Sequence, residues 1–331
     1  MINPKLKLSE KVFKKDIEMI STRQGYGEGL VIAGENDENV IALCADLTES
    51  TRSILFKEKF PERFIEMGVA EQGMATVAAG MAVYGKIPFI NSYAVFSPGR
   101  NWEQIRTTIA INDVPVKIVG SHTGVSVGPD GATHQMLEDI ALMRSMPNMI
   151  VIAPADSIEA KKTTIEVAKN NKPTYIRLTK EKTPTFTTEK TPFKIGRAET
   201  VWESKDPQVA IIACGHLVYE ALLAAKELSK SKIEVLVINS HTIKPLDEQT
   251  IIKAAKIAGC VVTVEEHQIT GGLGGAVAEV LSRNFPTPQE FIGMKDIFGE
   301  SGQPGELLEK YEMKAMDIVE ASKRAIKRKN S

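Results

Sequence analysis

The chain has 331 residues, of which 43% are hydrophobic and 25% are charged, and its net charge is −1. This length exceeds that of one ordinary domain and predicts two, each large enough to bury its own core. The near-zero net charge gives no electrostatic reason to expect nucleic acid or an anionic membrane as a partner. No apolar run approaches the length of a membrane span. We therefore expect a soluble protein with neither kind of partner.

The cysteine pattern indicates a reducing compartment. Cys44, Cys214 and Cys260 each lie in or beside an apolar run, which is typical of buried strand residues rather than of a disulfide framework or a metal cluster. The first residues, MINPKLKLSEKVFKK, lack the hydrophobic core of a secretory signal. We therefore expect the protein in the cytoplasm.

The first part of the chain alternates predicted strands and helices. The basic N-terminus is expected to be loosely attached, and Ser21 or Thr22 caps a segment that runs to about Asn36. Short apolar runs predict buried strands at 40–45, 87–90, 116–120, 149–153 and 174–178. Longer segments predict helices at 101–112, 136–144 and 156–170.

The second part repeats this alternation after a polar segment. Residues 179–191, TKEKTPTFTTEKT, show no apolar periodicity, so we interpret 181–194 as a linker between domains 1–180 and 195–331. Strands follow at 209–213, 234–238 and 261–265, with helices at 217–228, 248–258, 274–281 and 313–326. Strands that alternate with helices of these lengths predict an α/β fold with two doubly wound domains.

One stretch of the first domain places a single acid in an almost uncharged setting. Residues 64–80, FIEMGVAEQGMATVAAG, read as a strand that turns at Gly68 and continues as a helix of small residues beginning near Glu71. We expect the Glu71 side chain to face apolar or small neighbours, which raises the pKa of a carboxyl group and makes it a candidate for proton transfer. The alternative is that Glu71 only caps its helix.

A second candidate region is the loop that follows the strand at 116–120. It reads SHTGVSVGPDGATHQ and carries His122, Asp130 and His134 between glycines. The histidines suit contacts with the oxygens of a small polar substrate, and Asp130 suits a hydroxyl group. The alternative is that the histidines satisfy local backbone groups and Asp130 belongs to a Pro-Asp-Gly turn.

Four segments together resemble the transketolase family. They are GVAEQGM at 68–74, ADLTES at 45–50, the loop at 121–135 and MRSMPNMIVIAPAD at 143–156. The resemblance covers nearly the whole chain from about Thr22, and it matches the pyrimidine-binding and C-terminal domains of that family. It implies a thiamine diphosphate-binding fold followed by a transketolase C-terminal-like domain.

The resemblance also implies a reaction and the residues that carry it. The reaction is transfer of a two-carbon ketol unit from a ketose phosphate to an aldose phosphate with thiamine diphosphate as cofactor. Glu71 would hydrogen-bond the cofactor's pyrimidine ring, His122 and His134 would act on the sugar near its reacting carbons, and Asp130 would bind a sugar hydroxyl. By the same match Asp46 lies beside the cofactor and Phe96 stacks on the pyrimidine, with Tyr93 or Trp102 as alternatives, and the sugar phosphate is held by Arg23, Ser50 and Arg177.

The diphosphate-binding half of a full-length transketolase has no counterpart in this sequence. The resemblance therefore implies the C-terminal subunit of a split transketolase. A separate N-terminal subunit would hold Mg²⁺ and the cofactor's diphosphate, while the present chain supplies no metal ligand. The expected assembly is a heterotetramer that contains a dimer of this chain.

Three alternatives remain at this point. The first is the beta subunit of a 2-oxo acid dehydrogenase decarboxylase, and His122 together with the DGATHQ run argues against it. The second is a 1-deoxyxylulose 5-phosphate synthase-like enzyme, which shares the Asp-Gly-x-Thr-His-Gln pattern but not a histidine at position 122. The third is a non-catalytic regulatory subunit, which has no need of Glu71 and both histidines.

Overall fold

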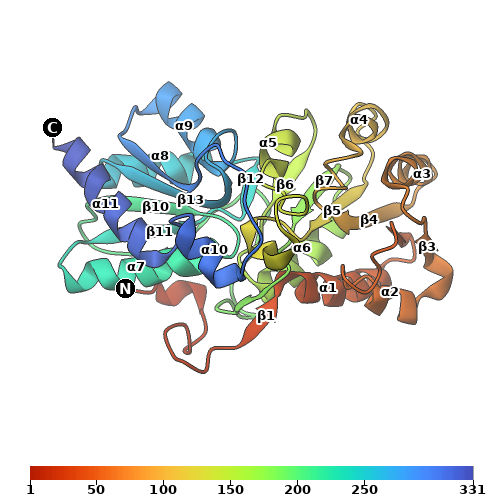
Figure 1. Cartoon of the computed structure of the whole chain (residues 1–331), viewed down its shortest axis with the longest axis horizontal. Helices are drawn as coiled ribbons and strands as arrows, with labels where there is room; N and C mark the ends of the chain where they lie inside the picture. Colours follow the sequence, from red (N-terminus) through yellow and green to blue (C-terminus); the bar gives the residue numbers. More distant parts are fainter. Residues whose placement is uncertain (331) are drawn as a thin grey trace.

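The computed structural model describes residues 1–330 and contains two α/β units that lie side by side (Figure 1). The first unit is built on a seven-stranded sheet in the order β12-β6-β7-β5-β4-β2-β3. All of its strands except β12 are parallel, which confirms the predicted sheet type. The parallel strands are β2 (Val40–Cys44), β3 (Phe64–Glu66), β4 (Ile87–Tyr93), β5 (Lys117–Ser121), β6 (Ile150–Ile152) and β7 (Thr174–Arg177).

Helices cover both faces of this sheet because successive strand residues point to opposite sides. Ile41 and Leu43 of β2 pack in the core that includes α3, whereas Val40 and Ala42 pack in the core that includes α1 and α6. The α4 segment continues as a π-helical turn at Ile105–Ala110, so the helix predicted at 101–112 is not a regular α-helix. The helices are α1 (Thr22–Asn36), α2 (Ile54–Lys59), α3 (Glu71–Val83), α4 (Trp102–Gln104), α5 (Asp139–Arg144) and α6 (Ser157–Ala168).

The second unit has a five-stranded sheet in the order β14-β13-β10-β11-β9. Its strands are β9 (Glu199–Trp202), β10 (Val209–Ala213), β11 (Val235–Asn239), β13 (Val261–Gln268) and β14 (Gln289–Met294), and β9 alone is antiparallel to its neighbour. Its core includes α7 and α11 on one face of the sheet and α8 and α9 on the other. The helices are α7 (Leu217–Lys230), α8 (Glu248–Ala258), α9 (Leu273–Asn284), α10 (Pro304–Lys310) and α11 (Ala315–Lys329).

A short strand joins the two units. β12 (Thr242–Lys244) follows β11 in the chain but pairs antiparallel with β6 of the first sheet. Ile243 of β12 belongs to the same hydrophobic cluster as Ile118 of the first sheet and Ile212 of the second. The two units are therefore coupled through a shared sheet edge and a continuous core, which the sequence pattern did not predict.

The N-terminus is not loosely attached, contrary to the prediction. Residues 1–17 run along the second unit, and Ile2 forms a β-bridge with Trp202 at the free edge of β9 (Figure 1). The backbone N–H of Asn3 donates to the Val201 carbonyl at 3.1 Å, and the buried side chains of Leu6 and Val12 belong to the core of this unit. The arm covers an edge that would otherwise be open to strand pairing.

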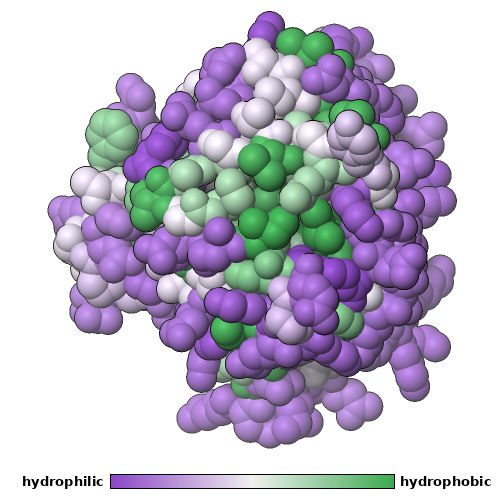
Figure 2. Space-filling model, turned by 90° about the vertical axis from the view of Figure 1, so that its right-hand side faces the viewer, coloured by the Kyte–Doolittle hydropathy of each residue, from purple (hydrophilic) through white to green (hydrophobic). Residues whose placement is uncertain are grey.

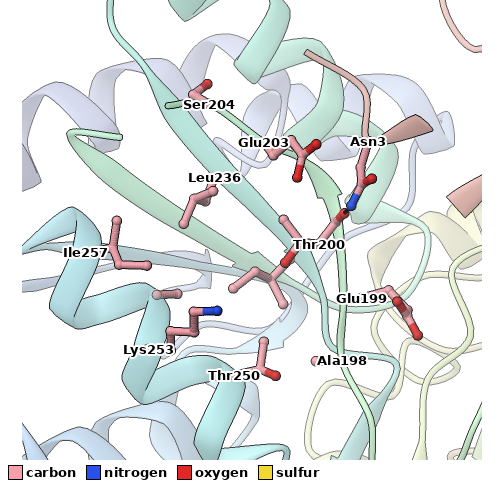
Figure 3. A pocket seen from close by; sticks show the side chains of 12 residues that line it. Asn3, Ala198, Glu199, Thr200, Glu203, Ser204, Leu236, Thr250, Lys253 and Ile257 are labelled. Carbon is pink, nitrogen blue, oxygen red and sulfur yellow. Dashed lines mark hydrogen bonds between the residues drawn. The ribbon is translucent and has the colours of Figure 1, made fainter. Parts of the chain in front are cut away.

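The arm also contributes to a cavity of about 390 Å³ in the second unit (Figure 3). Asn3, Glu199 and Lys253 are among its polar lining residues, and Leu236 and Ile257 are among its apolar ones. The cavity lies beside β9 and α8, and neither Glu71 nor any residue of the loop at 121–135 lines it.

The polar segment between the units is held by hydrogen bonds. β8 (Lys182–Pro184) pairs antiparallel with β1 (Met19–Ser21). The Asp156 carboxylate accepts the backbone N–H of Phe186 at 2.9 Å and of Thr187 at 2.7 Å. These contacts explain how a segment without apolar periodicity adopts one path.

Two further sequence observations concern burial and membranes. The three cysteines are free and buried, in agreement with their apolar sequence neighbours. Within residues 1–330, the apolar length needed to cross a bilayer is found in none of the helices.

Glu159 on α6 is a buried acid at the junction of the two units. Burial, with a further contribution from Asp156, raises the pKa of Glu159 to about 8. Its carboxyl oxygens accept the Ala155 N–H at 2.6 Å and the amide of Asn239, from the second unit, at 2.8 Å. The folded protein thus holds a proton that the unfolded chain releases in the acidic range.

We expect this proton to make stability depend on pH. Between the ordinary pKa of 4.5 and about 8, folded Glu159 binds more protons than unfolded Glu159. The free energy of unfolding should therefore fall as pH rises through this window, by up to about 5 kcal/mol. Urea denaturation across the window checks this: Glu159→Gln should flatten the slope, whereas the control Glu166→Gln, a partly exposed acid on the same helix, should retain it. Equal slopes for Glu159→Gln and the parent chain would contradict the expectation.

Candidate active site

Glu71 is the first residue of α3, and its side chain is only 2% exposed. Gly68, with φ of +65°, makes the predicted turn between β3 and α3. Glu71 lies one helical turn before Met74 and Ala75, which are fully buried on the inner face of α3. Because residues three and four apart share a helix face, the same geometry that buries these two side chains also buries the carboxyl group of Glu71.

The uncharged surroundings predicted for Glu71 are wrong. Nη1 of Arg100, from the loop after β4, lies 2.7 Å from Oε2 of Glu71. This ion pair offsets part of the cost of burying a charged group. The amide of Asn101 in the same loop donates to the Glu71 backbone carbonyl at 3.0 Å. Two side chains of the loop after β4 therefore contact Glu71, one at its carboxylate and the other at its backbone carbonyl.

Four aromatic rings form a group that we call the ring cluster: Tyr93, Phe96, His122 and His134. The His122 ring stacks on Tyr93 with a centroid distance of 3.8 Å. The His134 ring meets Phe96 edge-on at 5.6 Å and Tyr93 at 6.3 Å. The two histidines of the glycine-rich loop thus converge on the segment after β4.

The ring cluster is connected to Glu71. The Arg100 guanidinium lies over the Phe96 ring, with its central carbon 4.8 Å from the ring centroid, while it pairs with Glu71. The chain of contacts from Glu71 through Arg100 to Phe96 and His134 brings together the two sequence regions predicted to carry function. Trp102, an alternative to Phe96, instead donates its indole N–H to the Leu142 carbonyl at 3.2 Å.

His122 is buried in a strained backbone conformation. Its φ of +57° lies in the left-handed region, which a non-glycine residue occupies at an energetic cost. Nδ1 lies 2.8 Å from the Ser121 hydroxyl. Burial, together with the nearby charges of Arg23 and Lys180, lowers the pKa of His122 to about 3. The ring is therefore neutral at physiological pH, so one ring nitrogen can donate and the other can accept.

Asp130 forms an ion pair with Lys180, a residue that the sequence reasoning missed. Nζ of Lys180 lies 3.0 Å from Oδ2 of Asp130 and 3.1 Å from the Val127 carbonyl oxygen. Lys180 follows the end of β7, so it approaches the glycine-rich loop from a neighbouring strand. Lysine is abundant in this chain, with 41 Lys and Arg residues in total, and no local pattern distinguishes Lys180 from the rest.

Arg23, Ser50 and Asp46 lie near the carboxyl end of β2. Nη1 of Arg23 donates to the backbone carbonyl of Ser50 at 2.6 Å. Nε of Arg23 is buried and has no hydrogen-bond partner within the described part of the chain. Asp46 is exposed, has φ of +57°, and donates its backbone N–H to Glu66 at 2.8 Å. Arg23 is thus positioned with an unsatisfied donor, while the Asp46 side chain is open to a partner molecule.

Arg177, which the resemblance places at the sugar phosphate, has partners within the chain. Its Nε pairs with Asp139 at 2.7 Å, and its Nη2 donates to the Glu266 carbonyl at 2.7 Å. Burial opposes the charge of Arg177, but Asp139 outweighs this effect and raises the pKa of the guanidinium. Arg177 therefore links the two units, and its role in binding a sugar phosphate stays a prediction.

The donor set fits one part of the implied cofactor. A buried carboxylate and a partly exposed aromatic ring, both in contact with the Arg100 guanidinium, suit a planar heteroaromatic ring with a nitrogen that takes part in hydrogen bonding. The residues that would hold the pyrimidine of thiamine diphosphate are Glu71 and Phe96. No cluster of three or more His, Cys, Asp or Glu side chains suited to a metal occurs within residues 1–330.

Two family descriptions match the chain. "Transketolase, pyrimidine binding domain" matches residues 18–185, and "Transketolase, C-terminal domain" matches residues 196–318. These ranges cover nearly the whole of the two α/β units.

Individual relatives agree with these matches. A protein of Methanocaldococcus jannaschii, provisionally named a transketolase C-terminal section, is 44% identical over 90% of this chain and 93% of its own length. A 6-deoxy-6-sulfo-D-fructose transketolase subunit from a Clostridium species is 38% identical over 96% of this chain and 98% of its own length. A solved structure titled "Split gene transketolase, inactive beta4 tetramer" has a TM-score of 0.87 at 42% identity, and covers 94% of this chain and 99% of its own.

Proposed function

Because this chain belongs to the transketolase family, whose members are transferases that depend in general on thiamine diphosphate, we propose that it is the C-terminal subunit of a split transketolase. With an N-terminal subunit, it would transfer a two-carbon ketol unit from a ketose phosphate to an aldose phosphate. The cofactor supplies the electron sink when it is bound. The protein would hold and orient the cofactor and the sugar, and its side chains would move protons.

The observation that carries this proposal is the buried carboxyl of Glu71 connected through one loop to the ring cluster. Glu71 would hold a proton at the pyrimidine ring, and Phe96 would contact the face of that ring. His122 and His134 would donate to and accept from the sugar's oxygens near the reacting carbons, which suits a histidine held neutral by burial. Asp46 would lie beside the cofactor, at the carboxyl end of β2 where open α/β sheets bind ligands.

The proposed sugar-phosphate site adds one residue, Lys180, to those predicted from the sequence. Arg23 and Lys180 supply positive charge near His122, and both are partly exposed. Asp130 would bind a sugar hydroxyl, and Ser50 orients Arg23 through its carbonyl. Lys180 joins Arg177 in this proposal, because Lys180 faces the glycine-rich loop and lies near His122.

The proposed assembly is supported by an apolar face on the outside of α3. Figure 2 shows hydrophobic side chains that gather on the end of the molecule where α3 lies. Val77 is 39% exposed, Val83 68% and Tyr84 89%. A Cβ atom at Gly80 would meet nothing within 4 Å, so a partner helix has room to approach closely. We propose that this face packs against a second copy of the chain within a heterotetramer.

Three further parts of the proposal rest on the resemblance. Mg²⁺ and the cofactor's diphosphate would be held by the N-terminal subunit. Sugar phosphates would be the substrates, and the cytoplasm would be the compartment, in keeping with three free and buried cysteines.

Reconstitution tests the proposed function. The chain is mixed with its N-terminal partner, thiamine diphosphate, Mg²⁺, xylulose 5-phosphate and ribose 5-phosphate, and a seven-carbon sugar phosphate is expected by mass spectrometry. The chain alone should form none. Pyruvate consumption in place of ketol transfer would reassign the protein to the 2-oxo acid dehydrogenase or 1-deoxyxylulose 5-phosphate synthase alternatives, which the comparisons do not favour.

A further inference from the structure

The Arg100 guanidinium makes the two contacts that the proposed function assigns to the cofactor's pyrimidine ring. It pairs with Oε2 of Glu71 at 2.7 Å, and its central carbon lies 4.8 Å from the centroid of the Phe96 ring. We call the Glu71 carboxyl group and the face of the Phe96 ring together the pyrimidine seat. We propose that Arg100 occupies this seat in the cofactor-free chain and must leave it before the pyrimidine ring binds. This inference rests on the proposed function, because it takes the role of Glu71 from there.

The chemical likeness between the two occupants explains the competition. A guanidinium is planar, delocalised and rich in N–H donors, so it stacks on aromatic faces and binds carboxylates. An aminopyrimidine that shares a proton with a carboxyl group is also planar. It would need the Glu71 carboxyl and the face of the Phe96 ring, which are the groups that Arg100 contacts. Glu71 is 2% exposed, so its carboxyl has little surface at which both groups could bind at once.

The arginine side chain is able to leave without unfolding its loop. Its side chain is 46% exposed, so part of it already faces solvent. The loop backbone is held by other contacts: the Asn101 amide donates to the Glu71 carbonyl at 3.0 Å and to the Ser97 hydroxyl at 3.1 Å. The Arg100 N–H donates to the Phe96 carbonyl at 3.0 Å. A change of Arg100 rotamer leaves all three of these hydrogen bonds in place.

The consequence is a penalty on cofactor affinity. When a site is open in only a fraction of the molecules, the apparent dissociation constant equals the intrinsic one divided by that fraction. If Arg100 occupies the seat in about nine molecules of ten, its removal should tighten binding about tenfold. The contact also keeps the buried Glu71 carboxylate paired when no cofactor is present, since an unpaired buried charge is costly.

Cofactor binding to the full-length chain tests this inference without reference to turnover. Isothermal titration calorimetry is done with thiamine diphosphate and, separately, with 4-amino-5-hydroxymethyl-2-methylpyrimidine, which carries the ring but no diphosphate. Arg100→Met should bind both ligands about five- to tenfold more tightly than the parent chain. Arg100→Lys, which keeps the charge but loses the planar fork, should give a smaller gain. Arg106→Met, a change of an exposed arginine shortly after Arg100, is the matched control and should leave both affinities unchanged.

Each other outcome contradicts the inference. Weaker binding of thiamine diphosphate by Arg100→Met, with the pyrimidine unaffected, would make Arg100 a diphosphate contact instead. Unchanged affinity for both ligands would show that Arg100 does not compete for the seat. Glu71→Gln separates this result from the proposed function: if Glu71→Gln binds thiamine diphosphate as the parent chain does and turns over like the parent in the reconstituted enzyme, the role of Glu71 itself fails, whatever Arg100 does. Thermal unfolding of each variant confirms that the fold is retained.

Discussion

Replacing Glu71 by glutamine is expected to lower the turnover of the reconstituted enzyme by about 100- to 10,000-fold, the range of a lost general acid or base. Glutamine keeps the size of the side chain and a hydrogen-bonding oxygen but does not exchange a proton. Glu71→Ala should be at least as severe. Steady-state kinetics with xylulose 5-phosphate and ribose 5-phosphate measure the effect.

The matched control for Glu71 is Glu103→Gln, a change of an exposed acid on neighbouring α4. It should leave turnover within about twofold of the parent, because exposed substitutions away from a site have small effects. Circular dichroism separates loss of catalysis from loss of fold. Turnover by Glu71→Gln close to that of the parent would exclude Glu71 as the proton-holding group.

Introducing a charge on the outer face of α3 is expected to disrupt the proposed dimer. Tyr84 is 89% exposed in the single chain, so Tyr84→Glu should leave the fold of the monomer intact. A buried tyrosine at the centre of an interface commonly contributes about 2 kcal/mol or more, so the dimer should weaken at least about 30-fold. Sedimentation velocity over a concentration series measures the dissociation constant.

Phe298 supplies the control for this experiment. It is 75% exposed and lies in the second unit after β14, away from α3. Phe298→Glu removes a similar exposed ring and should not change the sedimentation of the chain. Equal behaviour of Tyr84→Glu and the parent would place the contact between copies elsewhere.

The position of Glu71 was predictable from the sequence because it depends on short-range patterns. A strand, a glycine turn and a helix of small residues follow one another within 64–80, and the three-to-four-residue repeat of a helix decides which side chains face inward. The alternation of strands and helices likewise predicted the parallel sheets. The convergence of His122 and His134 was expected because one glycine-rich loop carries both.

The surroundings of Glu71 were not predictable in the same way. Arg100 is 29 residues away in the chain and reaches the carboxyl group because β3, which precedes Glu71, and β4, which precedes Arg100, flank β2 in the same sheet. The expectation of uncharged neighbours considered residues near in sequence, whereas a buried carboxylate selects its partner from residues near in space.

Arg177 and Lys180 show the same difference. Both residues are basic and lie three positions apart. The sequence does not indicate which of them pairs with a buried acid and which with the glycine-rich loop. Arg177 ends β7 and is enclosed by Asp139 and the second unit, whereas Lys180 lies beyond the strand and reaches Asp130. The path of the chain after β7 decides that Arg177 contacts the second unit and that Lys180 contacts the glycine-rich loop.

The sequence by itself determined the local elements, the two-unit α/β architecture and the residues that the family resemblance marks, since each of these depends on residue order or on periodicity. Only the tertiary structure decided that the N-terminal arm covers the edge of β9, that β12 joins the first sheet and that Arg100 pairs with Glu71. These features form between segments far apart in the chain. They are set by the burial of apolar surface and the pairing of buried polar groups, which no local pattern encodes.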